Sequence, residues 1–356
     1  MATTLQLNSI SKTFGASSTL GTHKAVDDVS LQVPAGKFAA LLGASGSGKT
    51  TLLRIIAGLL DPDVGEVMFD GLSVTDVKPE RRNIGMVFQH HRLFPHMNVE
   101  KNITFGLRMR GVSKHEQKKR VIDVLEMVQL EGFEKRFPKS LSGGQQQRIA
   151  LARTIVTRPE VLLMDEPFSS LDAQLRDDLR DVVANLQAQL GMTTVFVTHD
   201  QREALQLADV VAVLDRGRLE QVASPPELYT RPASRTVANF MGVRNFMTGR
   251  LEQDRFITSL GHLQLCHPPQ DTNNEVTAVI RPEQITIHHE QADNLPNQIQ
   301  GQVTQVRYQG GVSRYLVSVG QDERLEVQGN YPDVAVGSQV WLELPPKHLW
   351  CLPKGV

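Results

Sequence analysis

The sequence predicts an α/β domain built on a mostly parallel sheet, followed by a smaller all-β domain of barrel type. Short β-branched apolar runs alternate with amphipathic segments over the first half of the chain, which is typical of a parallel sheet covered by helices. Strand patterns fade between residues 90 and 157. After about Met241, short alternating strands punctuated by Gly, Pro, Asn and Asp replace the helical patterns.

Length and composition agree with two globular domains. A chain of 356 residues with 40% hydrophobic and 22% charged residues is ordinary for such a protein. The formal net charge of −1 gives no reason to expect nucleic acid or anionic lipid as a partner. Two cysteines, Cys266 and Cys351, are too few for a disulfide framework and favour free thiols in a reducing compartment.

The N-terminus lacks the pattern of a secretory signal, and no apolar stretch approaches the ~20 residues that span a bilayer. If the protein works at a membrane, the membrane-spanning part is expected on another chain.

The expected elements of the first domain, residues 1–240, follow from apolar periodicity. Buried strands are expected at residues 38–42, 84–88, 161–164 and 194–198. One helical face between the last two strands comprises Leu175, Leu179, Val182, Val183, Leu186 and Leu190. A second helix is marked by Val121, Val124, Leu125 and Val128. Residues 90–157 are therefore expected to form a helical insertion in the α/β core.

The second domain, residues 241–356, is expected to be a barrel-like all-β unit. Its clearest strands are residues 276–280, 301–307, 314–319 and 339–344. Residues 229–242 are expected to form the linker between the domains.

A phosphate-binding loop is the clearest chemical motif. Residues 43–50 read Gly-Ala-Ser-Gly-Ser-Gly-Lys-Thr, with an apolar strand before them and a helix after them. Glycines let backbone N–H groups turn toward phosphate oxygens, and the helix start adds partial positive charge. Lys49 supplies a full charge to terminal phosphates, and Thr50 offers a hydroxyl to Mg²⁺. The motif predicts a P-loop NTPase fold.

The helix that leaves this loop is expected to bury Leu52, Leu53, Ile55, Ile56 and Leu59. The candidate phosphate-binding residues are Gly43, Ala44, Ser45, Gly46, Ser47, Gly48, Lys49, Thr50 and Thr51.

Two adjacent acids, Asp165 and Glu166, end a buried strand. Such acids are often only an exposed turn. Beside a P-loop, however, hydrolysis requires an acid for Mg²⁺ and a group that orients water, so Asp165 fits the metal role and Glu166 fits the role of general base. Gln89 and His199 follow two other strands, where the active sites of parallel sheets form. Taken singly, these two residues are weak signals.

Residues 141–145 read Leu-Ser-Gly-Gly-Gln and precede a helical run. Ser142, Gly143 and Gly144 at a helix start make a second anion site. This pattern also fits an ordinary helix cap, and it does not indicate whose phosphate the site would meet.

Taken together, these motifs resemble the ATP-binding cassette (ABC) family, the ATPase subunits that drive membrane transport, over residues 1 to about 240. The matching features are the P-loop, the Q-loop Gln89, the signature 141–145, Walker B with Asp165 and Glu166, the D-loop 169–172 and the switch histidine His199. The resemblance implies ATP and Mg²⁺ as ligands. It assigns catalysis to Glu166, His199 and Gln89, and the metal to Thr50, Gln89 and Asp165.

The same resemblance implies that Phe14 stacks on adenine. It also implies a head-to-tail homodimer, in which each ATP lies between one P-loop and the signature of the other subunit. The signature residues expected to touch that nucleotide are Ser142, Gly143, Gly144 and Gln145.

The tail resembles the TOBE-type regulatory domain of bacterial import ATPases. The matching residues are 280–283, 301–303, 308–310 and 337–341. The combination implies an importer ATPase at the cytoplasmic face of the cell membrane, docked on transmembrane permease subunits and working indirectly with a solute-binding protein. The implied solutes are sulfate, molybdate, ferric iron, polyamines or sugars.

Two alternatives remain: a non-transport ABC ATPase that acts on nucleic acid or ribosomes, and an exporter ATPase. The single cassette and the β-rich tail favour the importer, and no nucleic-acid partner is expected.

Overall fold

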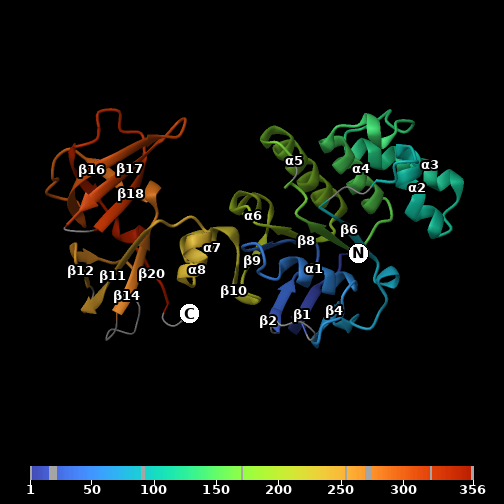
Figure 1. Ribbon diagram of the computed structural model, residues 1–356, viewed down its shortest axis with the longest axis horizontal. Coiled ribbons are helices and arrows are strands. Elements are labelled where there is room, and N and C mark those ends of the chain that lie inside the picture. Colours follow the sequence, from blue (N-terminus) through green and yellow to red (C-terminus); the bar gives the residue numbers. More distant parts are fainter. Residues whose placement is uncertain are drawn as a thin grey trace. The chain divides into compact units, whose positions relative to one another are not determined.

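The computed structural model describes residues 2–15, 22–89, 93–169, 171–252, 255–268, 275–320 and 323–353. Contacts divide the chain into two compact units, Met1–Pro225 and Pro226–Val356 (Figure 1). The division falls before the expected boundary at residue 240. The reason is that residues 229–242, expected as a linker, are held by the β-rich unit: Arg281 donates to the carbonyls of Tyr229 and Met241, and Trp350 Nε1 donates to Pro232 O.

The first unit contains a six-stranded sheet with the order β10-β9-β3-β8-β7-β6. The five strands from β9 to β6 run parallel, and β10 pairs antiparallel with β9. The strands are β3 (Phe38–Leu42), β6 (Ile84–Val87), β7 (Val161–Asp165), β8 (Thr193–Thr198), β9 (Val210–Asp215) and β10 (Arg218–Ala223). The four expected strands are β3, β6, β7 and β8.

A second, antiparallel sheet of the same unit has the order β2-β1-β4-β5. Its strands are β1 (Leu5–Phe14), β2 (His23–Val33), β4 (Val64–Phe69) and β5 (Leu72–Ser73). Apolar residues of both sheets and of α1 (Lys49–Ala57) form one buried cluster, so α1 packs between the sheets. Figure 1 shows α5 (Ala173–Leu190) and α6 (Gln201–Leu207) on the other side of the parallel sheet.

The expected burial of Leu59 is wrong, because its side chain is 52% exposed. The helix α1 ends at Ala57, and Gly58 adopts the left-handed conformation with φ 72°. Leu59 therefore no longer follows the helical period that buries Leu52, Leu53, Ile55 and Ile56.

The helical insertion is present. It comprises α2 (Val99–Met109), α3 (Lys114–Met127) and α4 (Gly143–Ile155), with short 3₁₀ turns at Pro79–Arg81 before it and at Pro138–Ser140 within it. These three helices lie together in Figure 1, and α2 packs against both α3 and α4.

The second unit begins with two short helices, α7 (Pro225–Thr230) and α8 (Arg235–Phe240), and continues as two antiparallel sheets. One sheet comprises β11 (Asn245–Glu252), β12 (Arg255–Thr258), β13 (Gly261–Gln264), β14 (Glu275–Ile280) and β20 (Trp350–Cys351). The other comprises β15 (Thr286–His288), β16 (Gln298–Tyr308), β17 (Ser313–Val319), β18 (Glu323–Gly329) and β19 (Gln339–Glu343).

The two sheets of the second unit enclose one apolar core, and the expectation of a barrel-like all-β domain is confirmed. Two 3₁₀ turns, Pro282–Gln284 and Pro346–His348, lie beside strands of this unit. Both cysteines are free; Cys266 is exposed and Cys351 is buried. No helix in the described ranges is long and apolar enough to cross a membrane.

Candidate functional site

The P-loop joins the end of β3 to the start of α1, and its glycines are required by the backbone. Gly48 has φ 98°, and a Cβ there would lie 2.2 Å from Ala25 O, so no other residue fits without a backbone shift. Lys49 is only 5% exposed. Its Nζ donates to Gly43 O at 2.8 Å and to Ala44 O at 2.7 Å. Burial lowers the pKa of Lys49, and the carboxylates of Glu166 and Asp165 oppose this shift.

Thr50 and Asp165 form the candidate metal pair. Thr50 Oγ1, in the first turn of α1, donates to Asp165 Oδ1 at 3.0 Å across the end of β7. Burial raises the pKa of Asp165, because an ionised carboxylate in this place loses hydration. A hydroxyl and a buried carboxylate are oxygen donors of the kind that Mg²⁺ prefers, so this pair fits a bound cation.

Glu166 lies where the carboxyl ends of three parallel strands meet. Gln89, after β6, donates from Nε2 to Glu166 Oε2 at 3.1 Å. His199, after β8, places Nδ1 at 3.4 Å from Glu166 Oε1. Sequence reasoning placed these three residues at the ends of strands, and the structure brings their side chains together.

The backbone of Glu166 is held in an uncommon conformation. Its φ is 46°, in the left-handed region that non-glycine residues rarely adopt. The amide donates to Val197 O at 3.1 Å, and the carbonyl accepts from Ser169 Oγ at 3.1 Å. These contacts on both sides of the peptide fix the direction in which the carboxylate points.

Gln89 was also expected at the metal. In the structure its Nε2 donates to Glu166 Oε2 at 3.1 Å and to Ser169 Oγ at 3.4 Å, and its place at a metal stays a prediction.

A buried network behind His199 was missed by the sequence reasoning. Thr198 Oγ1 donates to the buried carboxylate of Glu203 and accepts from the amide of Asp200 at 2.9 Å. Arg176 of α5 lies 3.7 Å from Asp200 and 4.0 Å from Glu203. The network holds the turn that presents His199. The sequence feature that could have indicated this network is Glu203, an acid four residues after His199 on the buried face of α6.

The signature residues lie at the start of α4. Ser142 is the N-cap: its Oγ accepts from Gln145 N at 3.3 Å, and Gln145 Oε1 accepts from Ser142 N at 3.0 Å. This capping box satisfies the Gln145 N–H and leaves the N–H groups of Gly143 and Gly144 without a helical acceptor; Gly143 is exposed and Gly144 is buried. Across the described ranges, no hydrogen bond connects Ser142 or Gln145 to the P-loop.

Phe14, the expected adenine contact, ends β1 and pairs with His23. Its side chain is 44% exposed, as a stacking role requires. The neighbouring residues 16–21 lie outside the described residues.

Comparisons with known proteins show which families and relatives this chain resembles. A family described as ABC transporter matches residues 26–169, and a TOBE domain family matches residues 278–352. A spermidine/putrescine import ATP-binding protein from Thermobifida fusca is 40% identical over 98% of this chain and 93% of its own length. An Fe(3+) ions import ATP-binding protein from Escherichia coli K12 is 40% identical over 98% of this chain and 97% of its own length.

Solved structures give the same result for the first unit. A dimeric ATP-binding cassette in a post-hydrolysis state, bound to ADP and Pi, is 32% identical and aligns with a TM-score of 0.56. The alignment covers 62% of this chain and 98% of that one. With relatives of this identity along nearly its whole length, the chain belongs to the family of ABC importer ATP-binding subunits with a C-terminal TOBE domain, and it is an ATPase.

Proposed function

We propose that this ATPase hydrolyses ATP through Glu166 and drives bacterial solute uptake as a head-to-tail homodimer. The observation that carries the proposal is the meeting of Gln89, Glu166 and His199 at the ends of β6, β7 and β8. The electrostatic influence of Glu166 and Asp165 on Lys49 supports one continuous site.

Lys49 and the P-loop amides bind the β- and γ-phosphates. In the structure the ammonium of Lys49 donates to carbonyls of its own loop, and phosphate oxygens would replace these acceptors. Thr50 and Asp165 would hold Mg²⁺, whose contribution is to neutralise charge on the phosphate oxygens. Phe14 supplies an exposed ring for the base.

Glu166 receives the proton of the attacking water. Its carboxylate is oriented by the amide of Gln89, and His199 lies within reach of the other oxygen. A general base in this position contributes typically 10²–10⁴-fold to the rate. Ser169 Oγ donates to Glu166 O and accepts from Gln89 Nε2. A movement of the D-loop would therefore change the contacts of Glu166.

The signature completes the site of a second copy. The start of α4, where the N-cap Ser142 and Gly143 are exposed, is suited to the γ-phosphate of the partner's ATP. The dimeric state of the similar cassette bound to ADP and Pi supports this arrangement. Closing and reopening of the dimer would act on permease subunits at the cytoplasmic face of the membrane, and indirectly on a solute-binding protein.

The transported solute is proposed from relatives of nearly equal similarity. One imports spermidine and putrescine and another imports ferric ions, and the wider group implied by the sequence includes inorganic oxyanions. We propose that the solute belongs to one of these three classes.

The test is a chromosomal Glu166→Gln allele in the native organism. Uptake of labelled putrescine, ferric iron, sulfate and molybdate is compared with wild-type cells, and Lys118→Gln, an exposed lysine of α3, is the control. Loss of uptake of one class would support the proposal and identify the solute. Unchanged uptake of all of them, with the variant protein present at normal level, would contradict it.

A further inference from the structure

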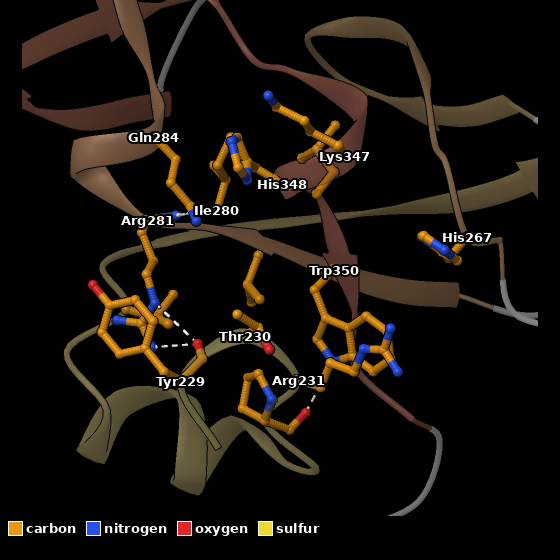
Figure 2. A pocket seen from close by; sticks show the side chains of 14 residues that line it. Tyr229, Thr230, Arg231, His267, Ile280, Arg281, Gln284, Lys347, His348 and Trp350 are labelled. Carbon is orange, nitrogen blue, oxygen red and sulfur yellow. Dashed lines mark hydrogen bonds between the residues drawn. The ribbon is translucent and has the colours of Figure 1, made fainter. Parts of the chain in front are cut away.

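The second unit contains a pocket lined by none of the candidate ATPase residues. It has a volume of about 250 Å³ and lies between residues 229–232 of the α7–α8 segment, the end of β14, and the 3₁₀ turn that leads into β20. Figure 2 shows Tyr229, Arg281 and Gln284 on one side, Trp350 and His267 on the other, and Lys347 with His348 above them. All lining residues belong to the unit Pro226–Val356.

The lining of this pocket is strongly cationic. Arg231, Arg281 and Lys347 contribute formal positive charge, and His267 and His348 can contribute more. None of the residues found to line the pocket is aspartate or glutamate. A concave site with one sign of charge attracts counter-ions, so the pocket favours an anion.

Arg281 is the fixed cation of the site. It is only 5% exposed, and its guanidinium carbon lies 3.3 Å from the centroid of the Tyr229 ring. Its hydrogen bonds go to the neutral carbonyls of Tyr229 and Met241 and use three of the five N–H groups of arginine. Within the described part of the chain no carboxylate forms an ion pair with it, and the nearby Glu283 accepts from the Tyr229 hydroxyl instead.

A buried guanidinium without a carboxylate partner is an expensive arrangement, because burial removes the hydration of the charge. Burial lowers the pKa of Arg281 for this reason. The nearby Glu283 and Tyr229 oppose this pKa shift, and an anion in the pocket would add a negative charge beside the guanidinium.

The rest of the lining indicates more than a bare inorganic ion. Val243, Val279, Ile280 and Leu349 are buried apolar walls, and Trp350 adds an aromatic surface. Small-molecule sites combine such walls with a few convergent polar groups. We propose that this pocket binds a small organic anion, whose carboxylate or phosphate group meets Arg281 and Lys347 while its neutral body packs on the apolar wall.

His348 gives the site a pH-dependent signature. Burial and the neighbouring Lys347 lower the pKa of His348. The other charged or titratable groups of the pocket are Arg281, Arg231, His267 and Tyr229, and Glu283 lies beside it. A bound anion would favour the imidazolium, so binding should take up a proton and strengthen as the pH falls from 8 to 6.

The experiment is calorimetric titration of the full-length protein with citrate and with glucose 6-phosphate, at constant ionic strength and at pH 6, 7 and 8. These two probes separate carboxylate from phosphate recognition. Glucose and sodium chloride serve as neutral and inorganic controls, and inorganic phosphate tests for an ion-only site. Lys49→Ala protein is titrated in parallel, because binding in this pocket, unlike binding at the P-loop, must survive that change.

Lys347→Gln tests the contact between the anion and Lys347. Lys347 is exposed, and its replacement leaves the bonds of Arg281 to Tyr229 and Met241 intact. Loss of one charge-assisted bond should weaken binding by about tenfold. Arg324→Gln, an exposed cation on β18 away from the pocket, is the matched control and should bind like wild type.

Binding of at least one organic anion that weakens in Lys347→Gln and toward high pH, with Arg324→Gln unchanged, is the expected result. Three outcomes would overturn the proposal: no binding of either organic anion, binding of inorganic phosphate alone, or binding unaffected by Lys347→Gln.

Discussion

At the residue scale, the site depends on charges that burial makes costly before any ligand arrives. Lys49 and Asp165 are both buried, and burial disfavours the charged form of each. Neither is satisfied by an opposite charge within ion-pair distance in the described residues, where Lys49 bonds to loop carbonyls and Asp165 accepts from Thr50. Binding of nucleotide and a cation would offset the cost of these buried charges. Ligand binding should therefore raise the stability of the fold.

Asp165→Asn should therefore stabilise the nucleotide-free protein at pH 7–8. Because the folded pKa of Asp165 is raised, its contribution to stability is present below the unfolded pKa and is lost as the pH rises through the folded pKa. Asparagine keeps an acceptor for Thr50 without the charge. A gain of about 1 kcal/mol would raise the melting temperature by roughly 2–4 °C.

Melting curves without nucleotide at pH 4–8 check this expectation. The difference between variant and wild type should shrink toward low pH, where the wild-type carboxyl is protonated. In the presence of Mg-ATP the order should reverse, because only the wild type keeps the metal carboxylate. A variant that is less stable at every pH would contradict the electrostatic account.

The positions of the candidate site residues at strand ends could be predicted from the sequence, whereas their contacts could not. The ends of β6, β7 and β8 followed from apolar runs, because parallel strands bring their carboxyl ends to one edge. The pairing of Gln89 with Glu166 did not follow, since it depends on side-chain rotamers and on the left-handed backbone of Glu166. Glu203 was missed because its role is visible only once α6 packs Glu203 against Thr198.

At the element scale, α4 presents the signature at its N-terminal end, where the N-cap Ser142 is exposed. Its N-cap box is complete within one chain, through the reciprocal bonds of Ser142 and Gln145. Gly144 packs against Leu175 of α5, and a Cβ there would lie 3.4 Å from that side chain. The helix is thus anchored against the α/β core at the same end that carries the signature.

Ser142→Arg should leave nucleotide binding by the monomer nearly intact and abolish hydrolysis. The bulky cation would occupy the place offered to the partner's phosphate, and it would remove a cap that contributes about 1 kcal/mol to helix stability. The expected result is an unchanged Kd for a fluorescent ATP analogue and no phosphate release. Ser140→Arg, an exposed residue just before the signature, is the control.

Loss of ATP binding in the Ser142→Arg monomer would contradict the head-to-tail arrangement. It would mean that the signature serves the P-loop of its own chain.

At the scale of the whole molecule, the boundary between the units decides which fragments should fold. The segment with α7 and α8 buries Leu228, Val237 and Ala238, and Arg281 ties its carbonyls to the β-rich unit. The boundary expected from the sequence lies later, at residue 240, because the short alternating strands that mark the second domain begin only after about Met241. The bonds from buried Arg281 to the carbonyls of Tyr229 and Met241 hold the segment with α7 and α8. Such bonds to the backbone leave no periodic pattern in the sequence.

Residues 1–225 should therefore form a soluble, cooperatively folding ATPase, since Phe14, the P-loop, the signature and His199 all precede Pro225. A fragment that ends after Met241 should be less soluble, because it keeps α7 and α8 without the unit that covers them. Thermal melts and phosphate release at saturating Mg-ATP compare the two fragments. A well-folded 1–225 fragment with no hydrolysis at high protein concentration would show that the second unit is required to assemble the site.

In the proposed reaction Glu166, held by Gln89 and His199, activates water for hydrolysis of ATP between two copies of the chain. Glu166→Gln isolates this role, because the amide keeps the size of the side chain but cannot take a proton. Steady-state phosphate release should fall by about 10²–10⁴-fold, while Mg-ATP still binds and accumulates an ATP-bound dimer on gel filtration. Hydrolysis at near wild-type rate would exclude Glu166 as the base, and a variant that remains monomeric with bound Mg-ATP would exclude the ATP-bound dimer.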